Sequence, residues 1–268
     1  MSDPIQVWID GVRKSSEEGL VCIKDRMDKR YASGSAYSIG LPFDAMRLQE
    51  IRKTVLQLAT PECNYETTRV LDVGCGNDGI AVFWPHQNIV GLDISEVAIR
   101  IAKERHPKVN YLAIPIEKYN PAQHGYGSFR MVVAVESIEH WMDVDKALDN
   151  IRQSMILGGW LVLTTPNTDS LHLRMMRKLG MILPKSSPDH LWEFGFQDLI
   201  HLVEKHGFAL LESKGVGLCP YIVTESNNKD ELRGLTDLDP DVNRWMNDIG
   251  RAMPPEYAFT QCHRFVSI

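Results

Sequence analysis

Apolar residues recur along the chain at two different spacings. Segment 45–59, AMRLQEIRKTVLQLA, has them at helical spacing, and Met46, Leu48, Ile51, Val55 and Leu58 would share one face. Short apolar, β-branched runs follow at 69–73, 88–93, 109–114, 129–135 and 160–165. Each of these runs predicts a buried strand, because such residues suit a pleated surface that is covered on both faces.

Helical patterns lie between these strands. Segment 95–106 predicts a helix with Ser95 as its N-cap, and 143–155 predicts one that ends at 157–159. A third helix is expected at 196–206, closed by Gly207. Alternation of strands and helices predicts an α/β fold with a mostly parallel sheet. We expect a helical N-terminal segment at 1–45 and one domain at 46–268, with a polar insertion at 225–255 before a last strand.

Composition narrows the classes of partner. The chain has 268 residues and a net charge of -6, which offers no bulk attraction to nucleic acid or to anionic membranes. No run reaches membrane-span length, and the first residues lack an apolar signal core. The five cysteines, an odd number, show no C-x-x-C spacing, so we expect reduced thiols in a cytoplasmic protein (Cys22, Cys63, Cys75, Cys219 and Cys262). The sequence indicates no particular oligomeric state.

A glycine-rich loop, VLDVGCGNDG at 70–79, follows the first predicted strand. Gly74 and Gly76 allow a tight turn and a close approach of the backbone to a ligand. Asp93, which ends the next strand, can accept hydrogen bonds from ribose hydroxyls. Asp72 suits an ammonium group better than a pyrophosphate. These features favour a nucleoside that carries an amino acid, and the alternative is a glycine-rich turn without a ligand.

The motifs VLDVGCG, GLDIS, AVESIEHW and LGGWLVLTTPN, in this order over 69–167, resemble those of class I S-adenosylmethionine-dependent methyltransferases. The resemblance implies a Rossmann-like, doubly wound, seven-stranded sheet whose last strand is antiparallel, and S-adenosylmethionine as cofactor. The N-terminal segment would then act as a lid. The sequence departs from the family at Pro115, where many members have Asp. The resemblance implies donor contacts from Asp72, Gly74, Cys75, Gly76, Asp93, Ile94, Ile116, Glu117, Val135 and Ser137.

Within this family, the ubiquinone-biosynthesis O-methyltransferases have a similar motif order. They also carry a proline followed shortly by Arg-Leu before the first strand, which LPFDAMRL at 41–48 loosely resembles. This makes Arg47 a candidate to bind the carboxylate of the donor's methionine part. The alternative is an arginine on a solvated helix face.

The stretch ESIEHW places Glu136, Glu139 and His140 after the strand at 129–135, where open α/β sheets bind ligands. Three hypotheses remain open. In the first, these residues are only a structural scaffold for the pocket. In the second, His140 is a general base, and in the third, the group binds a divalent metal such as Mg²⁺. For the third, the order E-x-x-E-H, T-P-N, H-x-W-E-F is similar to that of small-RNA 3′-terminal 2′-O-methyltransferases. That similarity implies Glu136, Glu139, His140 and His190 as ligands, and we take His140 and His190 as catalytic candidates.

The first functional hypothesis is O-methylation of a small molecule by in-line displacement. N-methylation of a small molecule is its variant, since an amine needs less help from a base. Methylation of RNA at a terminal 2′-hydroxyl is the second hypothesis, against which the acidic charge balance counts. A binder without catalysis is the third, and the intact glycines and Asp93 argue against it.

Overall fold

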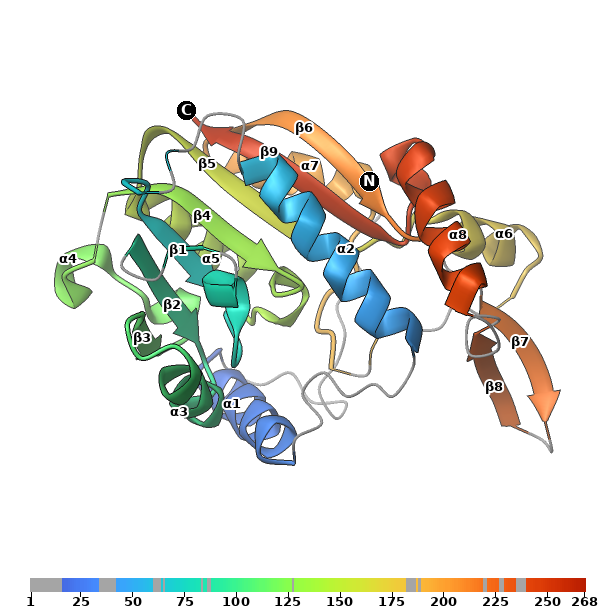
Figure 1. Cartoon of the computed structure of the whole chain (residues 1–268), viewed down its shortest axis with the longest axis horizontal. Coiled ribbons are helices and arrows are strands. Elements are labelled where there is room, and N and C mark those ends of the chain that lie inside the picture. The colour runs from blue at the N-terminus through green and yellow to red at the C-terminus, as the bar shows by residue number, and fades with distance from the viewer. Residues whose placement is uncertain are drawn as a thin grey trace.

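A seven-stranded sheet forms the centre of the computed structural model, which describes residues 16–33, 42–59, 64, 66–82, 84–85, 88–126, 128–181, 187, 189–218, 221–226, 229–234 and 240–268. Its strand order is β3-β2-β1-β4-β5-β9-β6 (Figure 1). Strand β9 runs antiparallel to β5 and β6, and the pairings among β3, β2, β1, β4 and β5 are parallel. The predicted sheet is therefore confirmed. The strands are β1 (Val70–Val73), β2 (Ile89–Asp93), β3 (Asn110–Ala113), β4 (Phe129–Val135), β5 (Met155–Pro166), β6 (Phe208–Val216) and β9 (Thr260–Ser267).

Helices cover both faces of this sheet (Figure 1). On one face, α2 and α3 contribute Ile51, Val55 and Ile99 to a buried apolar cluster. On the other face, α5 and α7 contribute Ile151 and Val203. Burying each such side chain stabilises the fold by about 1.5–3 kcal/mol. The helices are α1 (Ser16–Ala32), α2 (Pro42–Ala59), α3 (Glu96–Arg105), α4 (Pro121–His124), α5 (Val144–Ser154), α6 (Leu171–Lys178), α7 (Phe196–Lys205) and α8 (Pro240–Ala252).

Short 3-10 turns and a hairpin complete the described fold. The turns are η1 (Gly79–Val82), η3 (Ile116–Lys118), η4 (Ile138–His140) and η6 (Pro255–Tyr257). Strands β7 (Tyr221–Ser226) and β8 (Lys229–Gly234) form an antiparallel hairpin (Figure 1). The polar segment at 225–255 therefore contains regular structure that its composition did not predict.

Two local predictions were wrong. Helix α5 stops at Ser154, before 157–159, because the chain from Met155 already pairs with the start of β4. Strand β3 is only partly buried, with Asn110 and Ala113 exposed, because it lies at the edge of the sheet. The predicted helical face of α2 was correct, since Ile51, Val55 and Leu58 are buried; the side chain of Met46 lies outside the described residues.

The N-terminal segment contains helix α1 and the first residues of α2, and α1 packs against α3 (Figure 1). Tyr31 is buried in a small cluster with Ala98. The boundary predicted at residue 45 and the lid role stay predictions. Tyr37, Cys63 and Cys219 lie outside the described residues, and Cys22, Cys75 and Cys262 are free thiols. None of the helices in the described ranges is long and apolar enough to cross a bilayer.

Candidate functional site

The glycine-rich loop follows β1 and has the backbone that the sequence predicts. Gly74, Gly76 and Gly79 have φ angles of +72°, +58° and +50°, a region that L side chains rarely adopt. A Cβ atom on Gly74 would lie 2.2 Å from Oγ of Ser137. The loop therefore closes directly against the residue that follows β4 by two positions, and this links the predicted donor loop to ESIEHW.

Asp93 holds the loop from the end of β2. Its Oδ2 accepts a hydrogen bond from the Gly76 amide at 2.8 Å, and its Oδ1 accepts one from the Ser95 amide at 2.8 Å. The side chain is buried, and burial raises the pKa of Asp93 to about 6. Neighbouring Ile94 is half-buried. The carboxylate thus stands at the loop where the sequence predicts the ribose.

Asp72 is the second buried acid at this loop. Its Oδ2 accepts a hydrogen bond at 2.8 Å from the amide of Ile80, the residue that follows the last glycine of the loop. Burial raises the pKa of Asp72 to about 7, and the charge of Asp93 adds to this. Two buried carboxyls this close favour a cationic partner, and the ammonium group of an amino acid would fit. Cys75, in the same loop, is a buried free thiol, and its contact with a donor stays a prediction.

Glu117 and Ile116 lie in η3, after β3. The Glu117 carboxylate accepts from the amides of Met142 and Asp143 at 2.8 and 3.4 Å, and therefore holds the start of α5. Burial raises the pKa of Glu117. Ile116 is buried, and its carbonyl accepts from Nδ2 of Asn150 at 2.8 Å. Donor contact by these residues stays a prediction. The Glu117 side chain already accepts two hydrogen bonds from the backbone before α5.

Arg47 reaches the end of β4 from α2. Its Nη1 donates to Oε2 of Glu136 at 2.7 Å and to Oγ1 of Thr260 at 2.9 Å. Oε1 of Glu136 accepts from Oγ1 of Thr164 at 3.1 Å. Glu136 has a φ of +48°, which is strained for a residue with a Cβ atom. Val135, before it, is half-buried.

Glu139, His140 and His190 form a cluster in which one ligand atom from each lies within 4.8 Å of the others. Nε2 of His190 is 4.0 Å from Oε1 of Glu139. The two imidazole rings meet edge to face, with centroids 5.0 Å apart. Glu136 is not in this group, because its carboxylate is bonded to Arg47 and Thr164. The structure therefore brings together three of the four predicted metal ligands.

Outer hydrogen bonds orient each member of the cluster. Nδ1 of His140 donates to the Asp189 carbonyl at 3.1 Å, which leaves the Nε2 lone pair of His140 available. Nδ1 of His190 bonds Oε1 of Glu193 at 3.2 Å, and a proton there leaves its Nε2 available as well. Oε2 of Glu139 accepts from Oγ1 of Thr165 at 2.9 Å. This is the arrangement that orients imidazole and carboxylate ligands around a metal ion.

Burial dominates the electrostatics of the cluster. It raises the pKa of Glu139 to about 8, and the charge of Glu136 contributes in the same direction. Burial lowers the pKa of His140 to about 3, and the charge of His190 adds to the effect. For His190 burial alone would lower the pKa, but the hydrogen bond to Glu193 and the charge of Glu139 raise it above its usual value. His190 is therefore the better proton acceptor of the two histidines.

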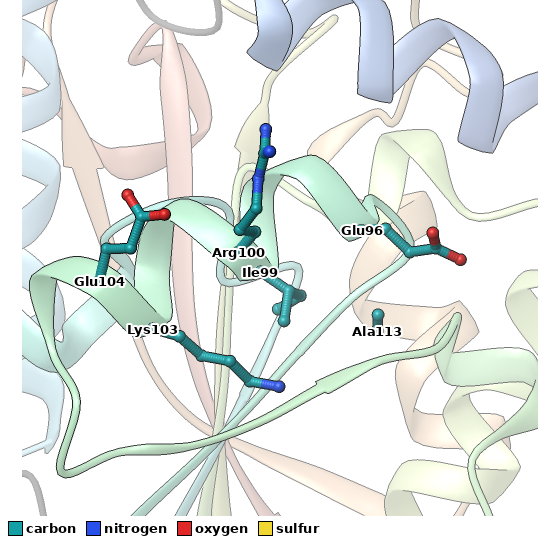
Figure 2. A pocket seen from close by; sticks show the side chains of 6 residues that line it. All are labelled: Glu96, Ile99, Arg100, Lys103, Glu104 and Ala113. Atoms are coloured by element: carbon teal, nitrogen blue, oxygen red, sulfur yellow. The ribbon is translucent and has the colours of Figure 1, made fainter.

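Ring nitrogens of two tryptophans and of His206 have structural partners. Nε1 of Trp141 donates to Oγ of Ser137 at 2.9 Å, and Nε1 of Trp192 donates to the Trp141 carbonyl at 2.7 Å. His206 pairs with Asp145 and Asp149 on α5. A hollow of about 480 Å³ lies against α3, and none of the predicted site residues lines it (Figure 2).

Sequence reasoning missed three residues that hold the cluster and one, Thr164, that holds Glu136 beside it. Thr164 and Thr165 lie in the TTPN motif. From the sequence alone, this motif supports only the family resemblance and predicts no role for the two hydroxyls. Glu193 lies in the aromatic-acid-aromatic run after His190, and it bonds that histidine. Asp189 contributes a backbone carbonyl, a group that no side-chain pattern reveals.

Residues 43–213 match the model of a methyltransferase domain family. The chain is 31% identical over 105 residues to the ubiquinone biosynthesis O-methyltransferase of Bordetella avium, covering 37% of this chain and less than half (43%) of that enzyme. It is 25% identical over 183 residues to the enzyme of the same name from Thiobacillus denitrificans, covering 65% of this chain and 78% of that one. The fold is similar to that of the N-methyltransferase NodS of Bradyrhizobium japonicum in complex with S-adenosyl-L-homocysteine. Here the TM-score is 0.56 at 16% identity, over 91% of this chain and 98% of NodS, so this likeness shows the fold alone.

Proposed function

The chain belongs to the class I S-adenosylmethionine-dependent methyltransferases, and from this premise we propose that it methylates a hydroxyl of a small molecule by in-line displacement. The domain match spans more than half of the chain, and S-adenosylmethionine is the cofactor. Support for oxygen as the acceptor comes from relatives whose names describe O-methyltransferases. The observation that carries the proposal is the position of Glu139, His140 and His190 immediately beyond the donor loop.

The proposed donor site uses the loop after β1. Asp93 would accept hydrogen bonds from the ribose, while Asp72 would attract the ammonium group. Ser137 touches Gly74 of the donor loop. His140, at the end of η4, follows Ser137 by only three residues and therefore lies close to that loop. A methyl group carried by the donor would then face residues that can bind or deprotonate an acceptor.

The cluster fits a divalent cation. One carboxylate and two imidazoles are suitable ligands for several divalent metals, and their outer bonds to Thr165, Asp189 and Glu193 orient them as metal sites require. A bound cation would lower the pKa of a coordinated hydroxyl. The residues themselves would hold the acceptor oxygen beside the donor and exclude water. With a cation bound, Nε2 of His190 would be one of its ligands; without a cation, the same atom would take up the proton of the acceptor hydroxyl.

Product analysis tests this proposal. The protein would be incubated with S-adenosylmethionine and a panel of phenols, catechols and primary amines, with and without a chelator, and methylated products would be identified by mass spectrometry. We expect O-methylated products, and we expect the chelator and His190→Ala each to reduce the rate at least tenfold. Methylation of amines alone, at a rate unaffected by chelator, would contradict the proposal and support the N-methylation alternative.

A terminal 2′-hydroxyl of RNA is the second candidate acceptor. The observation in its favour is the grouping of Glu139, His140 and His190, since the order of these residues along the chain is similar to that in small-RNA 2′-O-methyltransferases. The net charge of -6 disfavours it, because phosphate binding requires a basic surface. Salt-sensitive binding of a short RNA would support this candidate, and no binding at low salt would remove it.

A further inference from the structure

Helix α1 lies between the donor side of the site and the segment that carries His190. It packs along α3, as Figure 1 shows. Arg26 and Arg30 are four residues apart and share one face of the helix, while Asp28 points to the opposite face. The two faces bind different parts of the site, so α1 connects them physically.

The Asp28 face contacts the donor side. Oδ1 of Asp28 accepts from Oγ of Ser95 at 2.6 Å and from the Val97 amide at 3.1 Å. Ser95 in turn donates its amide to Asp93, the proposed ribose ligand. Tyr31 packs on Ala98 in the same place. Any ligand that orders Asp93 and the start of α3 therefore also stabilises this docked position of α1.

The arginine face contacts Asp189. Nη1 of Arg26 lies 3.3 Å from one carboxylate oxygen of Asp189, and Nη1 of Arg30 lies 3.1 Å from the other. The backbone of Asp189 is the acceptor for Nδ1 of His140, and the next residue is His190. Two guanidinium groups thus fix the peptide unit that orients one imidazole and leads into the other.

We propose that Asp189 is a positioning residue through which α1 couples donor binding to the placement of His140 and His190. Arg26, Arg30 and Asp189 form what we call the α1 clasp. Hydrogen bonds connect Asp93 through Ser95 to Asp28, and helix α1 itself connects Asp28 to the clasp. The functional meaning of the coupling rests on the proposed role of the two imidazoles, but the coupling itself does not.

Hydrogen–deuterium exchange with S-adenosyl-L-homocysteine tests the coupling. The amides of Leu191 and Trp192 donate to the Glu139 carbonyl, at 2.8 and 3.1 Å, and they report the order of the histidine segment. In the wild type, saturating S-adenosyl-L-homocysteine should slow their exchange by about fivefold or more, the lower end of typical coupling between sites. We do not expect S-adenosyl-L-homocysteine to contact these amides. Variants that break the α1 clasp then test whether the slowing of exchange is transmitted through α1.

The variants are Arg26→Ala/Arg30→Ala, Asp189→Asn and Lys29→Ala. Lys29 is exposed on the same helix, and its removal changes the charge without touching Asp189. We expect the first two to bind S-adenosyl-L-homocysteine, measured by calorimetry, but to lose the slowing of exchange, and Lys29→Ala to keep it.

Slowing that survives in both clasp variants would overturn the inference, as would its absence in the wild type. If the Arg26→Ala/Arg30→Ala variant folds poorly, Asp189→Asn still tests the same contact by the same exchange measurement. Neither metal nor acceptor is present, so this result does not depend on whether the acceptor is a hydroxyl. Failure of the proposed O-methylation and failure of the coupling can therefore be told apart.

Discussion

Arg47 on α2 donates a hydrogen bond across 2.7 Å to Glu136, which stands at the end of β4. Both side chains are only 11% exposed, so the pair is shielded from solvent. This ion pair holds the Glu136 carboxylate apart from the Glu139, His140 and His190 cluster. Two glutamates three residues apart in the sequence therefore have different partners, and only one faces the histidines.

The left-handed backbone of Glu136 leads to a first prediction. At φ +48° an alanine is strained while a glycine is not, and both substitutions remove the same carboxylate. Glu136→Gly should therefore be more stable than Glu136→Ala by about 1 kcal/mol, as measured by urea unfolding. Equal unfolding free energies would show that the backbone at 136 relaxes without cost.

The close approach of Gly74 to Ser137 leads to a second prediction. Gly74→Ala places a Cβ atom 2.2 Å from Oγ of Ser137 and should weaken S-adenosyl-L-homocysteine binding at least tenfold by calorimetry. Gly125→Ala is the matched control, because its φ of +71° is nearly the same and nothing lies within 4 Å of the added atom. The control should lose about 1 kcal/mol of stability and keep its affinity. Equal affinity in both variants would rule out the loop contact as the cause.

The buried Glu139 carboxyl leads to a third prediction, on stability against pH. Its pKa rises from 4.5 to about 8 on folding, through burial and the charge of Glu136. The folded chain then binds more protons than the unfolded chain between these values, so the free energy of unfolding falls as pH rises through this window.

Glu139→Gln removes this dependence. The variant should therefore gain stability relative to the wild type as pH rises from 4.5 to 8, by at most about 1.4 kcal/mol per pH unit. Glu104→Gln, at an exposed position of α3, should show no such trend. Parallel stability curves for wild type and Glu139→Gln would contradict the assignment.

The bond between Glu193 and His190 leads to a fourth prediction. This hydrogen bond and the Glu193 charge are among the causes that raise the His190 pKa against the effect of burial. Glu193→Gln should lower the His190 pKa, measured by NMR titration of the imidazole. Glu204→Gln, exposed on α7, should leave it unchanged. An unmoved pKa in Glu193→Gln would mean that the charges of Glu139 and Glu136 set the basicity of His190.

The parallel strands and the donor loop were predictable because they depend on local patterns. The glycines at 74, 76 and 79 and the apolar run before them determine both a turn and a strand. The hairpin and α8 were not predictable, because a polar segment can hide an amphipathic helix whose apolar side packs on another element. Helix α5 was predicted too long because pairing of Met155 with β4 competes with the last turn of the helix.

The candidate site was predictable in its residues but not in its pairings. Spacing alone makes Glu136 and Glu139 equivalent, and the difference comes from Arg47, 89 positions before Glu136 along the chain. The carbonyl of Asp189 and the hydroxyls of Thr164 and Thr165 act through contacts that only the fold creates. Long-range hydrogen bonds of this kind leave no periodic signal in a sequence.

Calorimetric titration of Mn²⁺ into protein saturated with S-adenosyl-L-homocysteine, beside His190→Ala, tests the central claim most directly. The account predicts saturable binding at one site in the wild type and its loss in the variant, with the affinity for S-adenosyl-L-homocysteine unchanged in both. Absence of binding in the wild type, or equal binding in both proteins, would contradict the claim that Glu139, His140 and His190 together hold a cation beside the methyl donor.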